Sequence, residues 1–167
     1  IWYGMMQIRN ELTTMHYRSN GQWSCPVVMR VPVGGYIHGS LCHSQCIDGY
    51  FTHMPGLYIA YPSNAEDAKG LLKMACRIDN PVMFMEHKGL YRQGFAASPE
   101  PDAKYLLPFG KAAIVNEGND MTIVTWGALV QKTIEAARNT NISAEIIDLR
   151  TLNPLDMDTI LTSLKKT

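Results

Sequence analysis

The sequence predicts an α/β protein whose sheets are largely parallel. Short apolar runs bounded by proline and glycine alternate along the chain with segments of helical periodicity. These runs are apolar at successive positions, as in strands that are covered by helices on both faces. Strands that alternate with helices form parallel sheets, because each connection crosses back over the sheet. No internal repeat or low-complexity tract interrupts this pattern.

The first part of the chain is expected to form three helices and three strands. Apolar residues recur at spacings of three and four from Met5 to Met15, which predicts one helix that ends near Gly21. Ser63 is followed three residues later by Glu66, the pattern of a capping box at the start of a helix. Proline or a glycine pair lies beside each apolar run and limits it. The helices are expected at 4–17, 43–53 and 63–77, and the strands at 25–31, 57–61 and 81–85.

The composition changes at residues 94–108, where Pro99, Pro101 and Pro108 lie among small residues. Such a segment is typical of a linker. We therefore expect one domain at 1–95, a linker at 96–107 and a second domain at 108–167. In the second domain, a turn at 117–120 is expected to join two strands as a hairpin. Its strands are expected at 111–115, 121–125 and 144–149, and its helices at 128–138 and from Pro154 onward.

The charge balance excludes some classes of partner. The 167 residues include 15 basic and 15 acidic side chains and no Lys/Arg-rich block, so we expect no nucleic-acid-binding surface. No apolar run approaches the ~20 residues that span a bilayer, so we expect no transmembrane helix and no membrane partner. Charged residues make up 18% of the chain, against roughly 25% in typical soluble domains. This low fraction predicts a large subunit interface, or further chain at one end or both.

The four cysteines are expected to be reduced. Cys25, Cys42, Cys46 and Cys76 form no C-x-x-C pair, so neither a zinc site nor a thioredoxin-type motif is indicated. The proximity of Cys42, His43 and Cys46 does not complete a zinc spacing. We therefore expect buried thiols that pack as small hydrophobic groups in a reducing compartment.

The segment 30–45 is the most unusual in the chain. It follows a predicted parallel strand, and ligands of open α/β folds bind at the carboxyl ends of such strands. Its glycines allow close backbone approach, and His38 and His43 could transfer protons near neutral pH. Alternatively, the glycines only shape a turn and the histidines are capping or surface groups. The pattern alone leaves both interpretations open.

Other candidate groups have structural explanations. Glu66 and Asp67 lie at a helix start, where capping and the helix dipole account for acidic residues. No Gly-x-Ser-x-Gly elbow supports a serine nucleophile. The aromatic residues Trp2, Tyr3 and Tyr17 could stack on a ring, but core packing is the commoner role of such side chains.

Taken together, the motifs resemble one protein family over nearly the whole chain and in the family's order. The matching stretches are 26–32, 34–39, 43–45, 55–57, 66–71, 80–81, 90–92, 110–112, 122–127 and 148–156. The chain resembles the β subunit of the thiamine-diphosphate-dependent decarboxylating component of 2-oxo acid dehydrogenase complexes. The resemblance implies part of a transketolase-like pyrimidine-binding domain at 1–95 and part of a transketolase C-terminal-like domain at 108–167.

The resemblance also implies an active site that this stretch forms only in part. The family's glutamate that contacts the aminopyrimidine is expected upstream of Ile1. Magnesium and the diphosphate are expected on an α subunit or an α-like region. The isolated stretch is therefore expected to be inactive and to form one wall of the site.

Several residues carry roles that the resemblance implies. His43 matches a histidine near the cofactor's reactive carbon, and Tyr17 matches an aromatic residue near the pyrimidine. His38 matches no family role. A structural potassium ion is implied, bound largely through backbone carbonyls. Its matching positions are Val27, Ala75, Cys76, Ile78 and Asn80.

The implied reaction is decarboxylation of a 2-oxo acid and transfer of the acyl group to lipoyl-lysine. The implied partners are the α subunit or region, a second β copy and the lipoyl-bearing acyltransferase. The stretches 17–21 and 35–39 favour a branched-chain 2-oxoisovalerate enzyme, while pyruvate and acetoin enzymes share most motifs. The implied location is the bacterial cytoplasm, or the mitochondrial matrix in a eukaryote. Two rival interpretations are another transketolase-like enzyme, such as a deoxyxylulose-phosphate synthase, and a non-catalytic assembly fragment.

Overall fold

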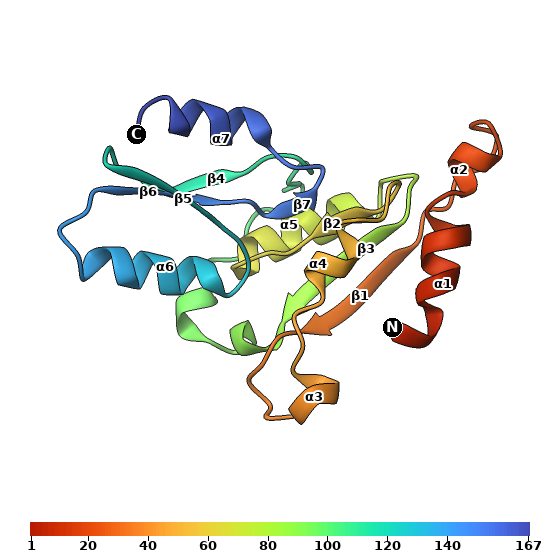
Figure 1. Ribbon diagram of the computed structural model, residues 1–167, viewed down its shortest axis with the longest axis horizontal. Helices are drawn as coiled ribbons and strands as arrows, with labels where there is room; N and C mark the ends of the chain where they lie inside the picture. The colour runs from red at the N-terminus through yellow and green to blue at the C-terminus, as the bar shows by residue number, and fades with distance from the viewer.

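The computed structural model describes residues 1–167 and contains two sheets (Figure 1). The first sheet has the order β1-β3-β2-β7, in which β1, β3 and β2 are parallel and β7 is antiparallel to β2. Its strands are β1 (Val28–Val33), β2 (Tyr58–Ala60), β3 (Val82–His87) and β7 (Thr151–Asn153). The predicted α/β class is confirmed, and the parallel strands place their carboxyl ends at one common edge.

The first predicted helix is a series of short helical turns. Thr13 and Thr14 donate side-chain hydrogen bonds to the carbonyls of Arg9 and Asn10, at 2.9 and 2.6 Å. Hydroxyl groups that bond to the preceding turn compete with the regular helical ladder. The segment accordingly comprises η1 (Trp2–Gly4), α1 (Met5–Gln7), the π-helical η2 (Ile8–Leu12) and α2 (Met15–Arg18).

The helix predicted at 43–53 is wrong in its bounds and continuity. The structure has two separate helices, α3 (Ser40–His43) and α4 (Asp48–Phe51). Gln45 lies between them, and its carbonyl accepts the backbone hydrogen bond of Gly34 at 2.8 Å. Because this carbonyl binds the end of β1, it cannot continue a helical ladder.

The predicted capping box is displaced by one residue. Helix α5 (Ala65–Ala75) has Asn64 as its N-cap, whose side chain accepts from the Asp67 backbone amide at 2.9 Å. Ser63 instead donates its hydroxyl hydrogen bond to Asp148, 2.5 Å away in the second half of the chain. Because Ser63 bonds to Asp148, Asn64 caps the helix in its place.

The hairpin predicted around 117–120 does not form. The second sheet has the order β4-β6-β5, so β6 lies between the two strands that were expected to pair. Strand β6 is antiparallel to β4 and parallel to β5. The amides of Asn119 and Asp120 instead donate to the Ser143 carbonyl, at 2.9 and 2.8 Å. The elements are β4 (Ala113–Asn116), β5 (Met121–Thr125), α6 (Leu129–Arg138), β6 (Ala144–Asp148) and α7 (Met157–Leu164).

Strand β7 returns from the second sheet to the first, and the sequence pattern did not reveal it. Asn153 donates its side-chain amide to the Leu57 carbonyl at 2.6 Å, next to β2. The segment 94–108 includes η4 (Gly94–Ala96), with η3 (Lys88–Leu90) just before it. Leu107 is buried against α5, and Lys73 donates to the Tyr105 carbonyl at 2.7 Å. The segment predicted as a linker therefore packs against α5.

The main apolar core lies between the first sheet and the N-terminal helical turns. Two expectations about burial were wrong: Tyr3 and Tyr17 are exposed rather than core residues, and none of the four free cysteines is buried. Short helices and loops cover this side of the sheet, and they leave large side chains at the surface. None of the helices is both long enough and apolar enough to cross a membrane.

Candidate functional site

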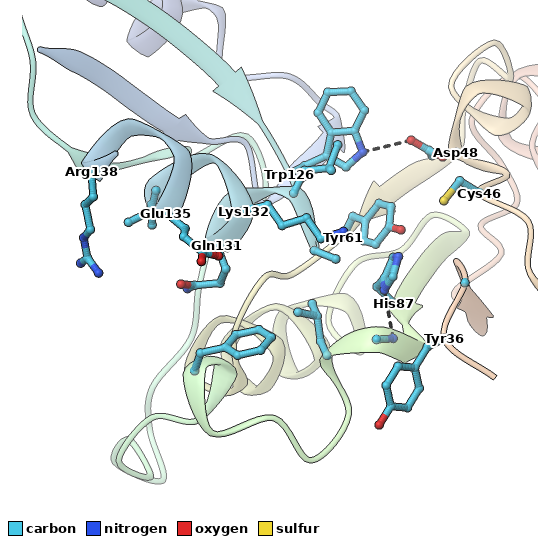
Figure 2. A pocket seen from close by; sticks show the side chains of 17 residues that line it. Tyr36, Cys46, Asp48, Tyr61, His87, Trp126, Gln131, Lys132, Glu135 and Arg138 are labelled. Atoms are coloured by element: carbon cyan, nitrogen blue, oxygen red, sulfur yellow. Dashed lines mark hydrogen bonds between the residues drawn. The ribbon is translucent and has the colours of Figure 1, made fainter. Parts of the chain in front are cut away.

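The carboxyl edge of the first sheet and helix α6 enclose a cavity of about 850 Å³. The edge contributes residues that follow β1, β2 and β3, while α6 contributes one wall from the second half of the chain (Figure 2). Ligands of parallel α/β sheets bind at this edge, and cavities of several hundred Å³ accommodate small molecules.

His87 ends β3 and lines this cavity. Its Nδ1 accepts a hydrogen bond from the Gly89 backbone amide at 3.0 Å. An imidazole nitrogen that accepts carries no hydrogen, so the neutral ring holds its hydrogen on Nε2. Burial lowers the pKa of His87, and the ammonium groups of Lys132 and Lys88 lower it further. His87 is therefore a neutral donor near pH 7.

Gly34 provides the space that His87 occupies. A Cβ atom at Gly34 would lie 2.1 Å from His87 Nε2, and the Gly34 φ of +80° favours glycine. On its other side, His87 stacks on Tyr61, with ring centroids 6.5 Å apart and an interplanar angle of 20°. Burial raises the pKa of Tyr61, followed by the influence of Cys46 and Asp48, so its hydroxyl stays protonated. The edge thus presents two neutral polar rings.

A hydrogen bond between the two halves of the chain closes one side of the cavity. Trp126 donates from Nε1 to Asp48 Oδ2 at 3.0 Å (Figure 2). Cys46 lies beside Asp48, and burial followed by the Asp48 charge raises the pKa of its thiol. A thiol with a raised pKa is a poor nucleophile at neutral pH. Cys46 therefore lines the cavity without the properties of a reactive thiol.

His43 lies on the loop that leaves the same edge, outside the cavity lining. It is the last residue of α3, and its side chain is exposed. The Lys88 ammonium donates to the His43 carbonyl, which fastens the end of α3 to the end of β3. A Cβ atom at Gly39 would lie 2.4 Å from the His43 Cβ, so this close approach requires glycine. His38 lies in the same loop, with a positive φ of 53°.

The structure separates Tyr17 from His43. Tyr17 belongs to α2 and is 88% exposed. In Figure 1, α2 lies beyond the amino end of β1, while α3 follows its carboxyl end. The two residues implied to be near the cofactor therefore lie at opposite ends of one strand.

The five positions implied for potassium gather at the amino ends of β1 and β3. The Val27 carbonyl already accepts from the Val82 amide at 2.8 Å, and the Ala75 carbonyl accepts from Ile78 at 3.3 Å. A carbonyl oxygen has two lone pairs, so each retains one for another ligand. The ion site remains a prediction at positions Val27, Ala75, Cys76, Ile78 and Asn80.

Comparison with known proteins decides the family. The transketolase pyrimidine-binding domain matches residues 3–93, and the transketolase C-terminal domain matches residues 110–167. The chain belongs to the transketolase family. The carboxyl edge that lines the cavity lies in the pyrimidine-binding domain, and α6 lies in the C-terminal domain.

The curated relatives confirm the resemblance to β subunits of 2-oxo acid dehydrogenases. The 2-oxoisovalerate dehydrogenase subunit beta of Bacillus subtilis is 46% identical, with 96% of this chain and 50% of the relative covered. The pyruvate dehydrogenase E1 component subunit beta of the same organism is 42% identical, with 98% and 50% covered. An acetoin:2,6-dichlorophenolindophenol oxidoreductase subunit beta of Cupriavidus necator is 44% identical, with 96% and 48% covered. The chain thus spans about half the length of these relatives.

A solved structure supports the fold. A split-gene transketolase, described as an inactive β4 tetramer, superposes with a TM-score of 0.73 at 23% identity. The alignment covers 99% of this chain and 50% of the transketolase chain. At this identity the likeness concerns the fold alone, which is that of the transketolase family.

The residues present fit one part of thiamine diphosphate chemistry. The pyrimidine-binding domain presents the exposed imidazole of His43 at its ligand-binding edge. No group of three or more His, Cys, Asp or Glu side chains in residues 1–167 is placed to hold a metal ion. An exposed imidazole of this kind is suited to proton transfer near an organic cofactor.

Sequence reasoning missed four residues that line the cavity. These residues are Asp48, Tyr61, His87 and Trp126. Tyr61 comes directly after β2 and His87 is the last residue of β3, and this position at the carboxyl end of a parallel strand was a usable signal. The Trp126–Asp48 contact joins residues 78 positions apart, and no local pattern indicated it.

Proposed function

We propose that this chain is part of a thiamine-diphosphate-dependent 2-oxo acid dehydrogenase, with a branched-chain 2-oxo acid as substrate. The complete enzyme decarboxylates the 2-oxo acid and transfers the acyl group to lipoyl-lysine of an acyltransferase. The observation that carries this proposal is similarity over 96% of the chain to a 2-oxoisovalerate dehydrogenase subunit beta at 46% identity. When bound, thiamine diphosphate supplies the carbanion stabilisation that decarboxylation needs.

His43 acts in the transfer step of this proposal. In that step the acyl carbon would form a bond to one lipoyl sulfur as the lipoyl disulfide breaks, and the other sulfur would take up a proton. The bond between the acyl carbon and the cofactor would then break, with loss of the proton from the acyl oxygen. His43 donates the proton to the sulfur, since an imidazole is suited to proton transfer near neutral pH. Its exposure and its fastening by Lys88 support the role, because a large partner can reach an exposed ring whose backbone is fixed.

The remaining parts of the site come from partners. An α subunit or α-like region holds magnesium and the diphosphate, and a second β copy completes the assembly. Potassium is proposed at the carbonyl positions around the end of α5, where it steadies the amino edge of the first sheet. Tyr17 is proposed to face the cofactor's pyrimidine; its 88% exposure leaves the ring free for contact with another chain or group. The isolated stretch is expected to be inactive for this reason. The enzyme is proposed to work in the bacterial cytoplasm or the mitochondrial matrix.

The test replaces His43 with alanine in the complete enzyme. H43A is expected to reduce acylation of a lipoyl domain at least 100-fold, roughly the contribution of one general acid. Decarboxylation measured with an artificial electron acceptor is expected to fall much less. The control is H53A, because His53 is likewise exposed and lies just after α4. Equal losses in both assays would contradict the transfer role, and unchanged activity would favour a non-catalytic assembly role.

A second candidate substrate class follows from the other relatives. The pyruvate and acetoin proteins are 42% and 44% identical, close to the 46% of the 2-oxoisovalerate protein. Comparing kcat/KM of the complete enzyme for 3-methyl-2-oxobutanoate, pyruvate and acetoin decides between them. The branched-chain proposal requires the first substrate to be preferred, and a preference for pyruvate or acetoin would overturn it.

A further inference from the structure

The cavity between the carboxyl edge and α6 contains cationic and donor groups without a protein partner. Lys132 extends from α6 toward Tyr61 (Figure 2), and it takes part in no ion pair or hydrogen bond within the chain. His87 uses only Nδ1 in a hydrogen bond, to Gly89, and this fixes the hydrogen on Nε2. Lys132 and His87 line the same cavity. The Lys132 ammonium and the neutral donor of His87 are therefore both available to a ligand in this cavity.

The remaining lining is largely apolar. Leu90 and Phe95 come from the segment after β3, and Leu129 comes from the start of α6. Phe95 and Leu129 are 56% and 54% exposed, so substantial apolar surface borders the cavity. A volume of about 850 Å³ accommodates a small organic molecule. Burial of a ligand's apolar body against these side chains would be favourable.

From these groups we infer that the cavity binds a small monocarboxylate with an apolar body. The carboxylate pairs with Lys132 and accepts from His87 Nε2, while the body packs against Phe95 and Leu129. A charged acceptor beside an ammonium forms a strong hydrogen bond in a partly desolvated site. The site is distinct from His43, which lies outside the cavity lining. The inference does not depend on the proposed function.

The acidic residues of the lining argue against a phosphate ligand. Asp48 and Glu135 face the cavity together with Lys132 and Arg138, so the charged lining is balanced. Asp48 accepts a hydrogen bond from the Trp126 indole at 3.0 Å. Asp48 and Glu135 repel a dianion about twice as strongly as a monoanion, so this balanced lining favours a ligand with a single negative charge. The ligand class is therefore a monocarboxylate.

The test measures binding of phenylacetate to the complete protein that contains this chain, by isothermal titration calorimetry. Phenylacetamide is the matched probe, since it has the same ring and lacks the charge. We expect phenylacetate to bind at least tenfold more tightly than the amide, about the effect of one charged pair. Inorganic phosphate is expected not to displace phenylacetate.

The variants separate the charge from the apolar contact. K132M removes the ammonium and keeps the side-chain length, and it is expected to raise the Kd of phenylacetate about tenfold without changing that of the amide. The control K165M changes an exposed lysine at the end of α7, remote from the lining, and should leave the Kd unchanged. F95A is expected to weaken both probes. Equal affinity for acid and amide, an unchanged Kd in K132M, or no binding of phenylacetate at roughly 10 mM would overturn the inference.

Discussion

Replacement of Gly34 by alanine tests whether His87 depends on the space at the end of β1. Gly34 has a φ of +80°, and a Cβ atom there would lie 2.1 Å from His87 Nε2 and 2.4 Å from Cδ2. These distances are far below van der Waals contact, so the imidazole must move. Movement of the ring breaks its hydrogen bond with the Gly89 amide and its stack on Tyr61.

The expected loss follows from three contributions. An alanine at a left-handed φ costs roughly 1–2 kcal/mol. The lost Gly89–His87 hydrogen bond contributes about 1 kcal/mol. The lost stacking between Tyr61 and His87 contributes about 0.5 kcal/mol or more. The free energy of unfolding of G34A is therefore expected to fall by about 3 kcal/mol.

The assay is urea unfolding, with G35A as the matched control. Gly35 is the next residue along the chain, and a Cβ atom there would meet nothing within 4 Å. G35A is expected to change the free energy of unfolding by about 0.5 kcal/mol or less, or to stabilise slightly by restricting the unfolded chain. If G34A lies within about 0.5 kcal/mol of G35A, His87 tolerates the added atom and the reasoning about the cavity edge is refuted.

Three further predictions concern contacts between the domains. Burial raises the pKa of Asp148 to about 6, above its value in an unfolded chain, so ionisation of this carboxyl destabilises the fold as the pH rises from about 4 to about 6. D148N mimics the protonated acid and does not ionise. Its free energy of unfolding should therefore rise by about 3 kcal/mol relative to that of the unsubstituted protein between pH 4 and pH 6. If urea unfolding shows the same difference between the two proteins from pH 4 to 7, the prediction is wrong. W126F removes the 3.0 Å hydrogen bond to Asp48 and should lower the free energy of unfolding by about 1–2 kcal/mol. The control W23F changes an indole that is 65% exposed and should leave that free energy unchanged. Equal urea midpoints for the two variants would contradict a stabilising role for the Trp126–Asp48 bond. D67N breaks the 2.9 Å pair of the buried Asp67 with Arg150 and should lower the free energy of unfolding by about 2 kcal/mol or more. The control E11Q breaks an exposed pair with Arg18 and should lower it by about 0.5 kcal/mol or less. Similar losses in the two variants would show that burial does not strengthen the Asp67 pair.

Local sequence patterns predicted that strands form at two apolar runs of the first domain. The apolar run after Pro81 became the central strand β3, whose first four residues are buried, as strands covered on both faces require. The run before Pro32 became β1, but the expected burial on both of its faces was wrong, because β1 is an edge strand in which Arg30 and Pro32 are exposed. The pattern failed where a distant group changed the local hydrogen bonding. Ser63 donates to Asp148 and leaves the cap to Asn64. The carbonyl of Gln45 accepts from Gly34 and divides a predicted helix in two.

In the candidate site, too, the sequence indicated a residue that belongs to a local motif and did not indicate features formed by distant segments. His43 could be found from the sequence, because it lies in an unusual glycine-rich loop and matches a family motif. The cavity could not be found in this way, since its walls come from both domains. The position of Lys132 on α6 has meaning only once α6 is placed over His87, and helical periodicity carries no such information.

The placement of α6 at the carboxyl edge depends on contacts made by residues 148–153, which lead from β6 of the second sheet to β7 of the first. The Tyr61 amide donates to the Arg150 carbonyl at 2.9 Å, and Arg150 pairs with Asp67 at the start of α5. A Cβ atom at Gly127 would lie 2.8 Å from the Tyr61 ring, so the chain that begins α6 passes directly over that side chain. The C-terminal domain thus contacts both the backbone amide and the ring of Tyr61, and the position of Tyr61 determines that of the stacked His87. The positions of Lys132 and His87 relative to each other therefore depend on the contacts between the two domains. D67N, which breaks the pair with Arg150, should raise the Kd of phenylacetate in the same calorimetric assay, although neither residue lines the cavity.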